Sequence, residues 1–145
     1  MARSYANRQG LQVLGPIAVE RELRDVLRRA TAQEPYESVT ARLETVEQSP
    51  EATGYEVAIR HTRLSLCWLY RLPLEDVMAS LRSYLAACPS VLDQATAVMA
   101  TVRDYPAAAD IMDELEDSLM LAPLSVEAVN VRRMWAQLRR DLRHP

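Results

Sequence analysis

Apolar residues recur every three or four positions along most of the chain, in stretches separated by prolines. This period places the apolar side chains of each stretch on one face of a helix. A proline in the first turn of a helix sacrifices no hydrogen bond, and its fixed φ angle suits helix entry. The pattern therefore predicts a series of short helices, which are separated by Pro16, Pro35, Pro50, Pro73, Pro89, Pro106 and Pro123.

Seven stretches of this kind are present, and none of the chain shows the strict alternation or the tight turns of a β-hairpin. The first two helices are predicted to follow Pro16 and Pro35. The third is predicted to open at a capping box made by Thr53 and Glu56 and to run to about Arg71. The last four are predicted to begin at Pro73, Ser90, Pro106 and Ser125. We expect an all-α fold of about seven helices, stacked as antiparallel helical hairpins.

The segment 76–89 is echoed 34 residues later by the segment 110–123. Five of the fourteen positions are identical, and they include the acidic first residue and the closing proline. The identical positions are otherwise apolar ones of the core type, whereas the positions between them differ. A period of this length, built from two short helices, is typical of proteins that stack helical hairpins.

The length, the apolar positions and the terminal proline resemble the tetratricopeptide repeat over residues 58–123. The chain departs from that family at its characteristic small residues. The glycine of the first helix is replaced by Ser65 and then by Met99, and the alanine of the second by Val77 and then by Ile111. The resemblance implies stacked hairpins closed by a C-terminal capping helix over residues 125–143.

In that family the first helices of successive repeats line a concave groove that binds a partner polypeptide. The resemblance places part of this lining at Ile59, Thr62, Leu66, Leu69, Tyr70, Thr96 and Arg103. Its first part is apolar and would suit the apolar face of a partner's helix or extended segment. The alternative is that the same leucines pack against the first two helices.

Composition restricts the class of protein. The chain has 145 residues and a net charge of −3, and all of its basic residues are arginine, which favours a high-GC bacterial genome over selection for an acidic partner. A nucleic-acid-binding protein usually carries a basic footprint, which this balance disfavours. We expect a flexible N-terminal arm over residues 1–15 and a single all-helical domain over residues 16–145. Residues 1–10 lack the apolar core of a signal peptide, so we expect a cytoplasmic protein without a membrane segment.

The residues that carry chemistry are sparse. His61 and His144 are the only histidines, and Cys67 and Cys88 lack the spacing of a metal site, so two buried reduced thiols are expected. No phosphate-binding loop or hydrolase motif is present. We therefore expect a protein that is not an enzyme and that needs no cofactor or metal. An enzyme that uses His61 together with the acidic segment described next stays as an alternative.

A second feature is the separation of charge between the last two predicted helices. Acidic residues gather at Asp110, Asp113, Glu114 and Asp117, and the final helix carries Arg132, Arg133, Arg139, Arg140 and Arg143. Two neighbouring antiparallel helices with complementary solvated faces would explain both groups. Alternatively, the acidic helix could block a basic active site, as in a toxin-immunity protein, or the arginines could bind nucleic acid in a regulator.

These patterns together predict a small interaction module that binds a partner polypeptide. It would act as a chaperone-like adaptor for a secreted, effector or toxin-like protein, or as an inhibitor. A homodimer that forms through an apolar surface competes with both interpretations.

Overall fold

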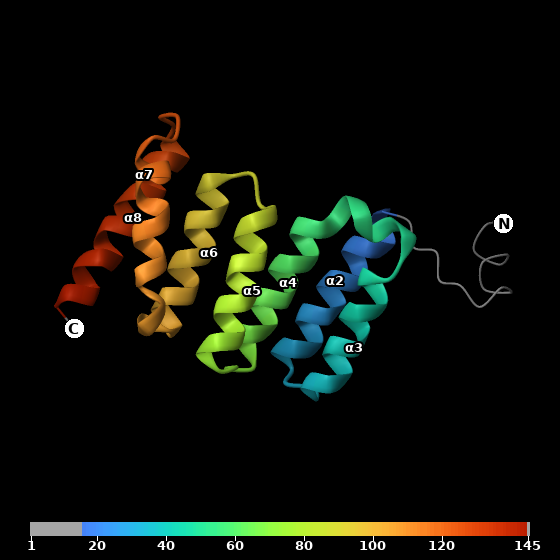
Figure 1. Ribbon diagram of the computed structural model, residues 1–145. Coiled ribbons are helices and arrows are strands. Elements are labelled where there is room, and N and C mark those ends of the chain that lie inside the picture. Colours follow the sequence, from blue (N-terminus) through green and yellow to red (C-terminus); the bar gives the residue numbers. More distant parts are fainter. Residues whose placement is uncertain (1–15, 145) are drawn as a thin grey trace, which may run out of the picture. The chain divides into compact units, whose positions relative to one another are not determined.

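A computed structural model describes residues 16–144 of the chain. Over this range it contains seven α-helices, two short 3-10 helices and no strand, which confirms the predicted all-α class (Figure 1). The chain divides between Arg71 and Leu72 into two compact units, which are described separately below. No helix in this part of the chain is long and apolar enough to cross a membrane. The predicted arm lies outside the described residues, and the predicted single domain stays a prediction.

The first unit is built from α2 (Pro16–Thr31), α3 (Tyr36–Glu47), the 3-10 helix η1 (Pro50–Tyr55) and α4 (Glu56–Leu69). Helix α2 contacts both α3 and α4, so its apolar stripe lies between them. The three helices and η1 share one core, which consists of Val19, Leu23, Val26, Ala30, Val39, Leu43, Val46, Ala52, Ile59 and Leu66.

The predicted capping box at the start of α4 is wrong. Pro50 begins η1, and Thr53 lies inside this 3-10 helix rather than at the N-cap of an α-helix. The N-cap of α4 is Tyr55, which makes no side-chain capping hydrogen bond. The sequence signature of a capping box was present. However, Pro50 begins a 3-10 helix, which is more tightly wound than an α-helix, and this helix includes Thr53, the first residue of the predicted capping box.

The second unit contains α5 (Leu74–Ala87), α6 (Val91–Asp104), the 3-10 helix η2 (Pro106–Ala108), α7 (Asp110–Met120) and α8 (Val126–Arg143). Helix α6 is central because it contacts α5, α7 and α8. The largest fully buried side chains of this unit are Leu81, Met99, Ile111, Met112, Leu119 and Trp135.

Two predicted helix starts are confirmed at the level of single atoms. The hydroxyl oxygen of Ser90 accepts a hydrogen bond from the backbone N–H of Asp93, and that of Ser125 accepts one from the backbone N–H of Ala128. Each serine thereby satisfies one of the free N–H groups of the first turn. At Pro106 the chain instead forms η2, so that α7 begins at Asp110.

The repeat also has a structural counterpart within the second unit. Both members of the echo are helical, and Val77 of α5 and Ile111 of α7 are buried. Several pairs of helices that follow one another in the chain are in contact, namely α2 and α3, α5 and α6, and α6 and α7. The tetratricopeptide frame also joined α4 to α5, but the boundary between the two units falls between these helices.

Candidate functional site

The first five residues of the predicted groove lie on or directly after α4. Ile59 and Leu66 belong to the core shared with α2 and α3, and Leu69 and Tyr70 pack against that core. Thr62 is buried, and its hydroxyl donates to the backbone carbonyl of Ala58. These leucines therefore pack against the first two helices, which is the alternative that the sequence left open.

The last two residues of the predicted groove lie on α6, in the second unit. Thr96 and Arg103 are both exposed. The hydroxyl of Thr96 donates to the carbonyl of Leu92 at 2.9 Å within the same helix. Arg103 makes no ion pair with a described residue, so it is available as a free surface cation.

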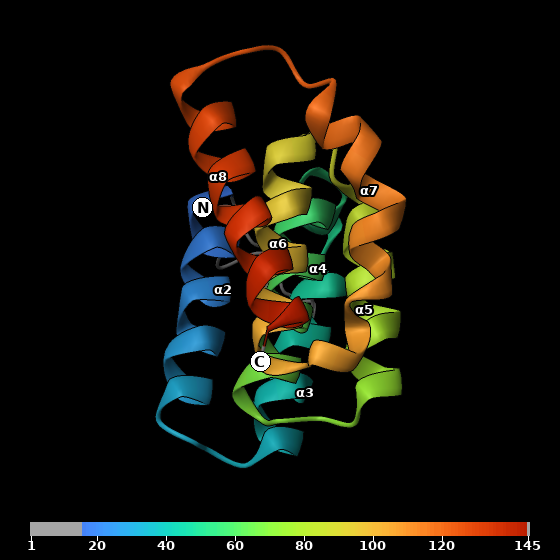
Figure 2. The ribbon, with the colours of Figure 1, turned by 90° about the vertical axis from the view of Figure 1, so that its left-hand side faces the viewer.

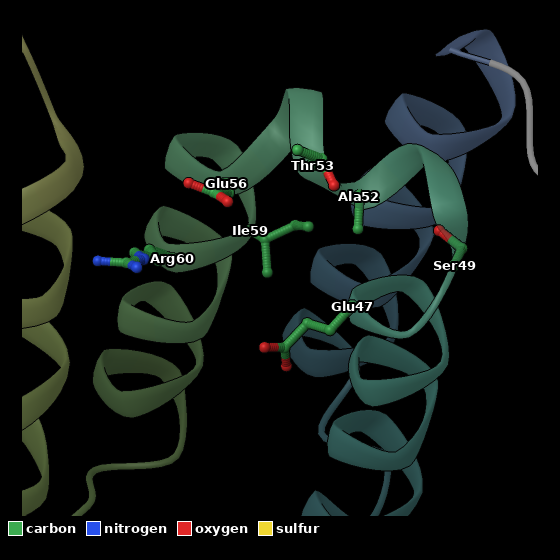
Figure 3. Close-up of a pocket in the computed structure, with 7 residues that line it drawn as sticks. All are labelled: Glu47, Ser49, Ala52, Thr53, Glu56, Ile59 and Arg60. Carbon is green, nitrogen blue, oxygen red and sulfur yellow. The ribbon is translucent and has the colours of Figure 1, made fainter.

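A polar pocket of about 270 Å³ lies in the first unit, between the end of α3, η1 and the start of α4 (Figure 3). Figure 3 shows the side chains of Glu47 and Glu56 near that of Ile59, whereas the guanidinium of Arg60 points away from Ile59. Glu47 also forms an ion pair with Arg63. Neither histidine nor cysteine lines this pocket, and its charged rim supplies no nucleophile with a base beside it.

The residues considered for chemistry are dispersed. The ring of His61 stands edge-on to the ring of Trp68, with centroids 6.0 Å apart. Cys67 and Cys88 are both free and buried, as predicted. Within residues 16–144, histidine, cysteine and acidic side chains form no group of three that could hold a metal ion.

The four acidic residues predicted as an alternative binding site are all exposed on α7. Two of them are engaged within the unit, since Asp113 forms an ion pair with Arg139 and Glu114 forms one with Arg82 at 3.1 Å. The side chains of Asp110 and Asp117 make no ion pair or hydrogen bond with any residue that the structure describes. The predicted pairing of acidic residues on α7 with arginines on α8 is therefore found at Asp113. The carboxylates of Asp110 and Asp117 have no such partner.

Two of the five arginines of α8 serve structural roles. The pairing of Arg139 with α7 was one alternative that the sequence left open, whereas the role of Arg132 was not indicated. Arg139 donates to Glu116, whose carboxylate also accepts a hydrogen bond of 3.0 Å from the indole N–H of Trp135. The indole N–H, followed by the Arg139 guanidinium, lowers the pKa of Glu116. Arg132 donates to three backbone carbonyls at the end of α7, those of Leu119, Met120 and Ala122.

The feature that sequence reasoning missed is an exposed apolar surface where α7 passes into α8. Leu121, Leu124 and Val126 are 83%, 79% and 81% exposed, and Met120 and Val129 are also exposed. We refer to these five residues as the α7–α8 apolar surface. A sequence signal existed, because the run 119–126 is mostly apolar although it contains the connection between two helices. A cluster of this kind on a folded protein usually marks an interaction site.

An open hollow of about 560 Å³ adjoins this surface, lined by Leu124, Ser125, Val126, Val129, Asn130 and Arg133. Three apolar side chains line it, and Arg133 supplies its only formal charge. The side chain of Arg133 makes no ion pair or hydrogen bond with the residues described. The hollow can therefore accept an apolar side chain, and the guanidinium of Arg133 beside it can bind an anionic group.

Comparison with known proteins finds no family model, no curated protein and no solved structure that matches the chain.

Proposed function

We propose that this protein is a non-enzymatic interaction module that binds a polypeptide through the α7–α8 apolar surface. The observation that carries the proposal is the exposure of Leu121, Leu124 and Val126, each about four-fifths accessible to solvent. Burying one such side chain completely contributes about 1.5–3 kcal/mol. Three of them supply roughly 5 kcal/mol or more before the costs of association.

The same surface favours an adaptor that uses apolar contact over an inhibitor that uses only its acidic helix. Asp113 and Glu114 already form ion pairs within the second unit, so half of the predicted acidic site is occupied. The buried state of Ile59 and Leu66 likewise turns the proposal away from the predicted groove and toward α7 and α8. The contacts between successive helices, a feature that the resemblance to the tetratricopeptide repeat implied, support the same class of function.

A photo-crosslinking amino acid placed at Leu124 tests the proposal in the protein's native host. We expect irradiation to produce a covalent adduct with a polypeptide. The matched control is the same amino acid at Leu74, an exposed apolar position on α5 (37%) that lies outside the α7–α8 apolar surface. The proposal is wrong if position 124 gives no polypeptide adduct, or if both positions give the same adducts in equal yield.

A further inference from the structure

We propose that the polypeptide bound by the α7–α8 apolar surface is a second copy of this chain, held in a two-fold symmetric dimer. This inference rests on the proposed function and identifies the partner. A two-fold interface uses the same surface patch on both copies, so that patch must be complementary to itself. The outer faces of α7 and α8 meet this requirement in charge, in spacing and in apolar character.

Charged side chains without an ion pair lie on both helices: those on α7 are acidic, whereas α8 carries arginines together with two carboxylates, Glu127 and Asp141. Asp110 and Asp117 on α7 form no ion pair with the described residues, and neither do Arg133 and Arg140 on α8. Arg140 donates only to the side-chain oxygen of Gln137, which is neutral. The chain therefore presents two free carboxylates on one helix and two guanidinium groups without a counter-charge on its neighbour.

The spacing of these charges matches. Asp110 and Asp117 are seven residues apart, and so are Arg133 and Arg140. Seven residues make about two turns of helix, so each pair lies on one face with a separation of roughly 10 Å along the axis. One register can therefore bring both carboxylates of one helix near both guanidinium groups of another.

Both charged pairs lie on the side of their helix that faces away from the unit's core. Helix α6 contacts α7 and α8, and Figure 2 shows these two helices in front of α6. Trp135 and Leu138 of α8 are buried, whereas Arg133 and Arg140 are exposed on the opposite face of the same helix. A second copy can approach this outer layer without disturbing the core.

The direction of the chain makes the two copies compatible. Asp117 and Arg133 are the members of each pair nearer the α7–α8 connection, because α7 runs toward it and α8 runs away from it. A two-fold axis roughly parallel to the helices sets α7 of each copy against α8 of the other. Asp117 then faces Arg133 of the other copy, and Asp110 faces Arg140.

The same operation brings the two α7–α8 apolar surfaces together at one end of the interface. Leu121 is 83% exposed, the highest value among the large apolar side chains described, and Arg133 lines the hollow together with Val126 and Val129. A protruding leucine from each copy can therefore enter the hollow of the other. Apolar burial supplies affinity, while the charge pairs fix orientation and exclude other registers.

Sedimentation velocity on the full chain tests this proposal by charge exchange. We expect the unmodified chain to form a dimer, and the variant pairs Arg133→Glu with Arg140→Glu and Asp110→Arg with Asp117→Arg each to be monomers. Like charges would then face each other, and we expect the dissociation constant to rise at least about 100-fold. An equimolar mixture of the two variants should form a heterodimer, because their altered charges are again opposite.

A control separates the interface from total charge. Arg103→Glu changes the same charge on α6 at an exposed position without an ion pair, and it should leave the dimer unchanged. Every variant should show the same helical content as the unmodified chain by circular dichroism. Formation of the heterodimer in the mixture would also show that both charge variants are folded.

The proposal is overturned if the unmodified chain stays monomeric up to about 1 mM, a concentration at which even weak complexes associate. It is also overturned if a dimer forms but the charge variants leave it intact. A monomeric chain that gives a foreign polypeptide adduct at position 124 would refute the dimer and retain the proposed function. A monomeric chain without any adduct would refute both.

Discussion

Arg132 should stabilise the second unit far more than its half-buried position on α8 suggests. Its Nε donates to the carbonyl of Leu119 at 3.2 Å, and its Nη2 donates to the carbonyls of Met120 and Ala122 at 2.9 and 2.6 Å. The last carbonyls of a helix have no partner within the helix, and a cation near them also interacts favourably with the helix dipole. The guanidinium therefore closes the C-terminal end of α7 and fixes it to α8.

The size of the effect can be estimated from these bonds. A hydrogen bond to a charged group contributes about 1.5–3 kcal/mol, but water can replace part of this at the partly exposed end of α7. We expect Arg132→Ala to lower the free energy of unfolding by about 2 kcal/mol. For a unit of this size the loss corresponds to a decrease of roughly 10 °C in Tm. Arg132→Lys should recover part of it, because lysine keeps the charge but not the planar fork of donors.

Thermal unfolding, followed by circular dichroism, measures these differences. A Trp68→Phe background makes Trp135 the only tryptophan, so its fluorescence reports on the second unit alone. The protein should be dilute, because binding of a second copy would add stability by mass action. The control is Arg103→Ala, which should change the stability by less than about 0.5 kcal/mol. Equal unfolding temperatures of Arg132→Ala and Arg103→Ala would show that the three hydrogen bonds of Arg132 do not stabilise the unit.

Three further predictions concern the core and the carboxylates. Glu116→Ala should lower the free energy of unfolding, measured in urea, by about 1–3 kcal/mol, because the buried indole N–H of Trp135 loses its acceptor. Glu116→Gln keeps an acceptor and should cost less. Equal losses for the two variants would contradict this. The Arg29 guanidinium, with that of its neighbour at position 28, lowers the pKa of Asp25 from 3.8 to about 2. The ionised Asp25 carboxylate should therefore stabilise the fold fully above about pH 4, and this stabilisation should be lost as the pH falls toward 2. Asp25→Asn should abolish this dependence of stability on pH. An NMR titration midpoint near 4 for Asp25 would contradict the prediction. Leu43→Ala should cost about 2–5 kcal/mol in urea unfolding, since Leu43 is fully buried in the first unit, and a loss below 1 kcal/mol would contradict that packing.

The features that sequence reasoning predicted correctly depend on local physics. The helical class follows from the spacing of apolar residues, and the N-caps at Ser90 and Ser125 follow from a hydroxyl three residues before a free N–H group. The capping box at Thr53 failed because two local signals competed, and the 3-10 helix that begins at Pro50 prevailed. Local patterns alone do not settle such a competition.

The features that could not be predicted depend on which helix faces meet. Positions 132 and 133 are adjacent and both are arginine. Arg132 donates to three backbone carbonyls, whereas Arg133 makes no ion pair with a described residue. The distinction arises because position 132 faces the end of α7 and position 133 faces away from the unit. The exposure of Leu121 and Leu124 has a similar origin, because these residues lie in the connection between helices, where helical periodicity does not apply.

The binding of a polypeptide by the α7–α8 apolar surface can be tested by a native mass spectrum of the protein, isolated from its native host under mild conditions. We expect a complex of the chain with one further polypeptide, a second copy of itself. We also expect that Leu124→Ser combined with Val126→Ser removes that polypeptide and leaves a folded monomer, since both side chains are about four-fifths exposed and their replacement disturbs no core. A bare monomer from the unmodified protein, or a complex that survives these two substitutions, would contradict the assignment of the α7–α8 apolar surface as a polypeptide-binding site.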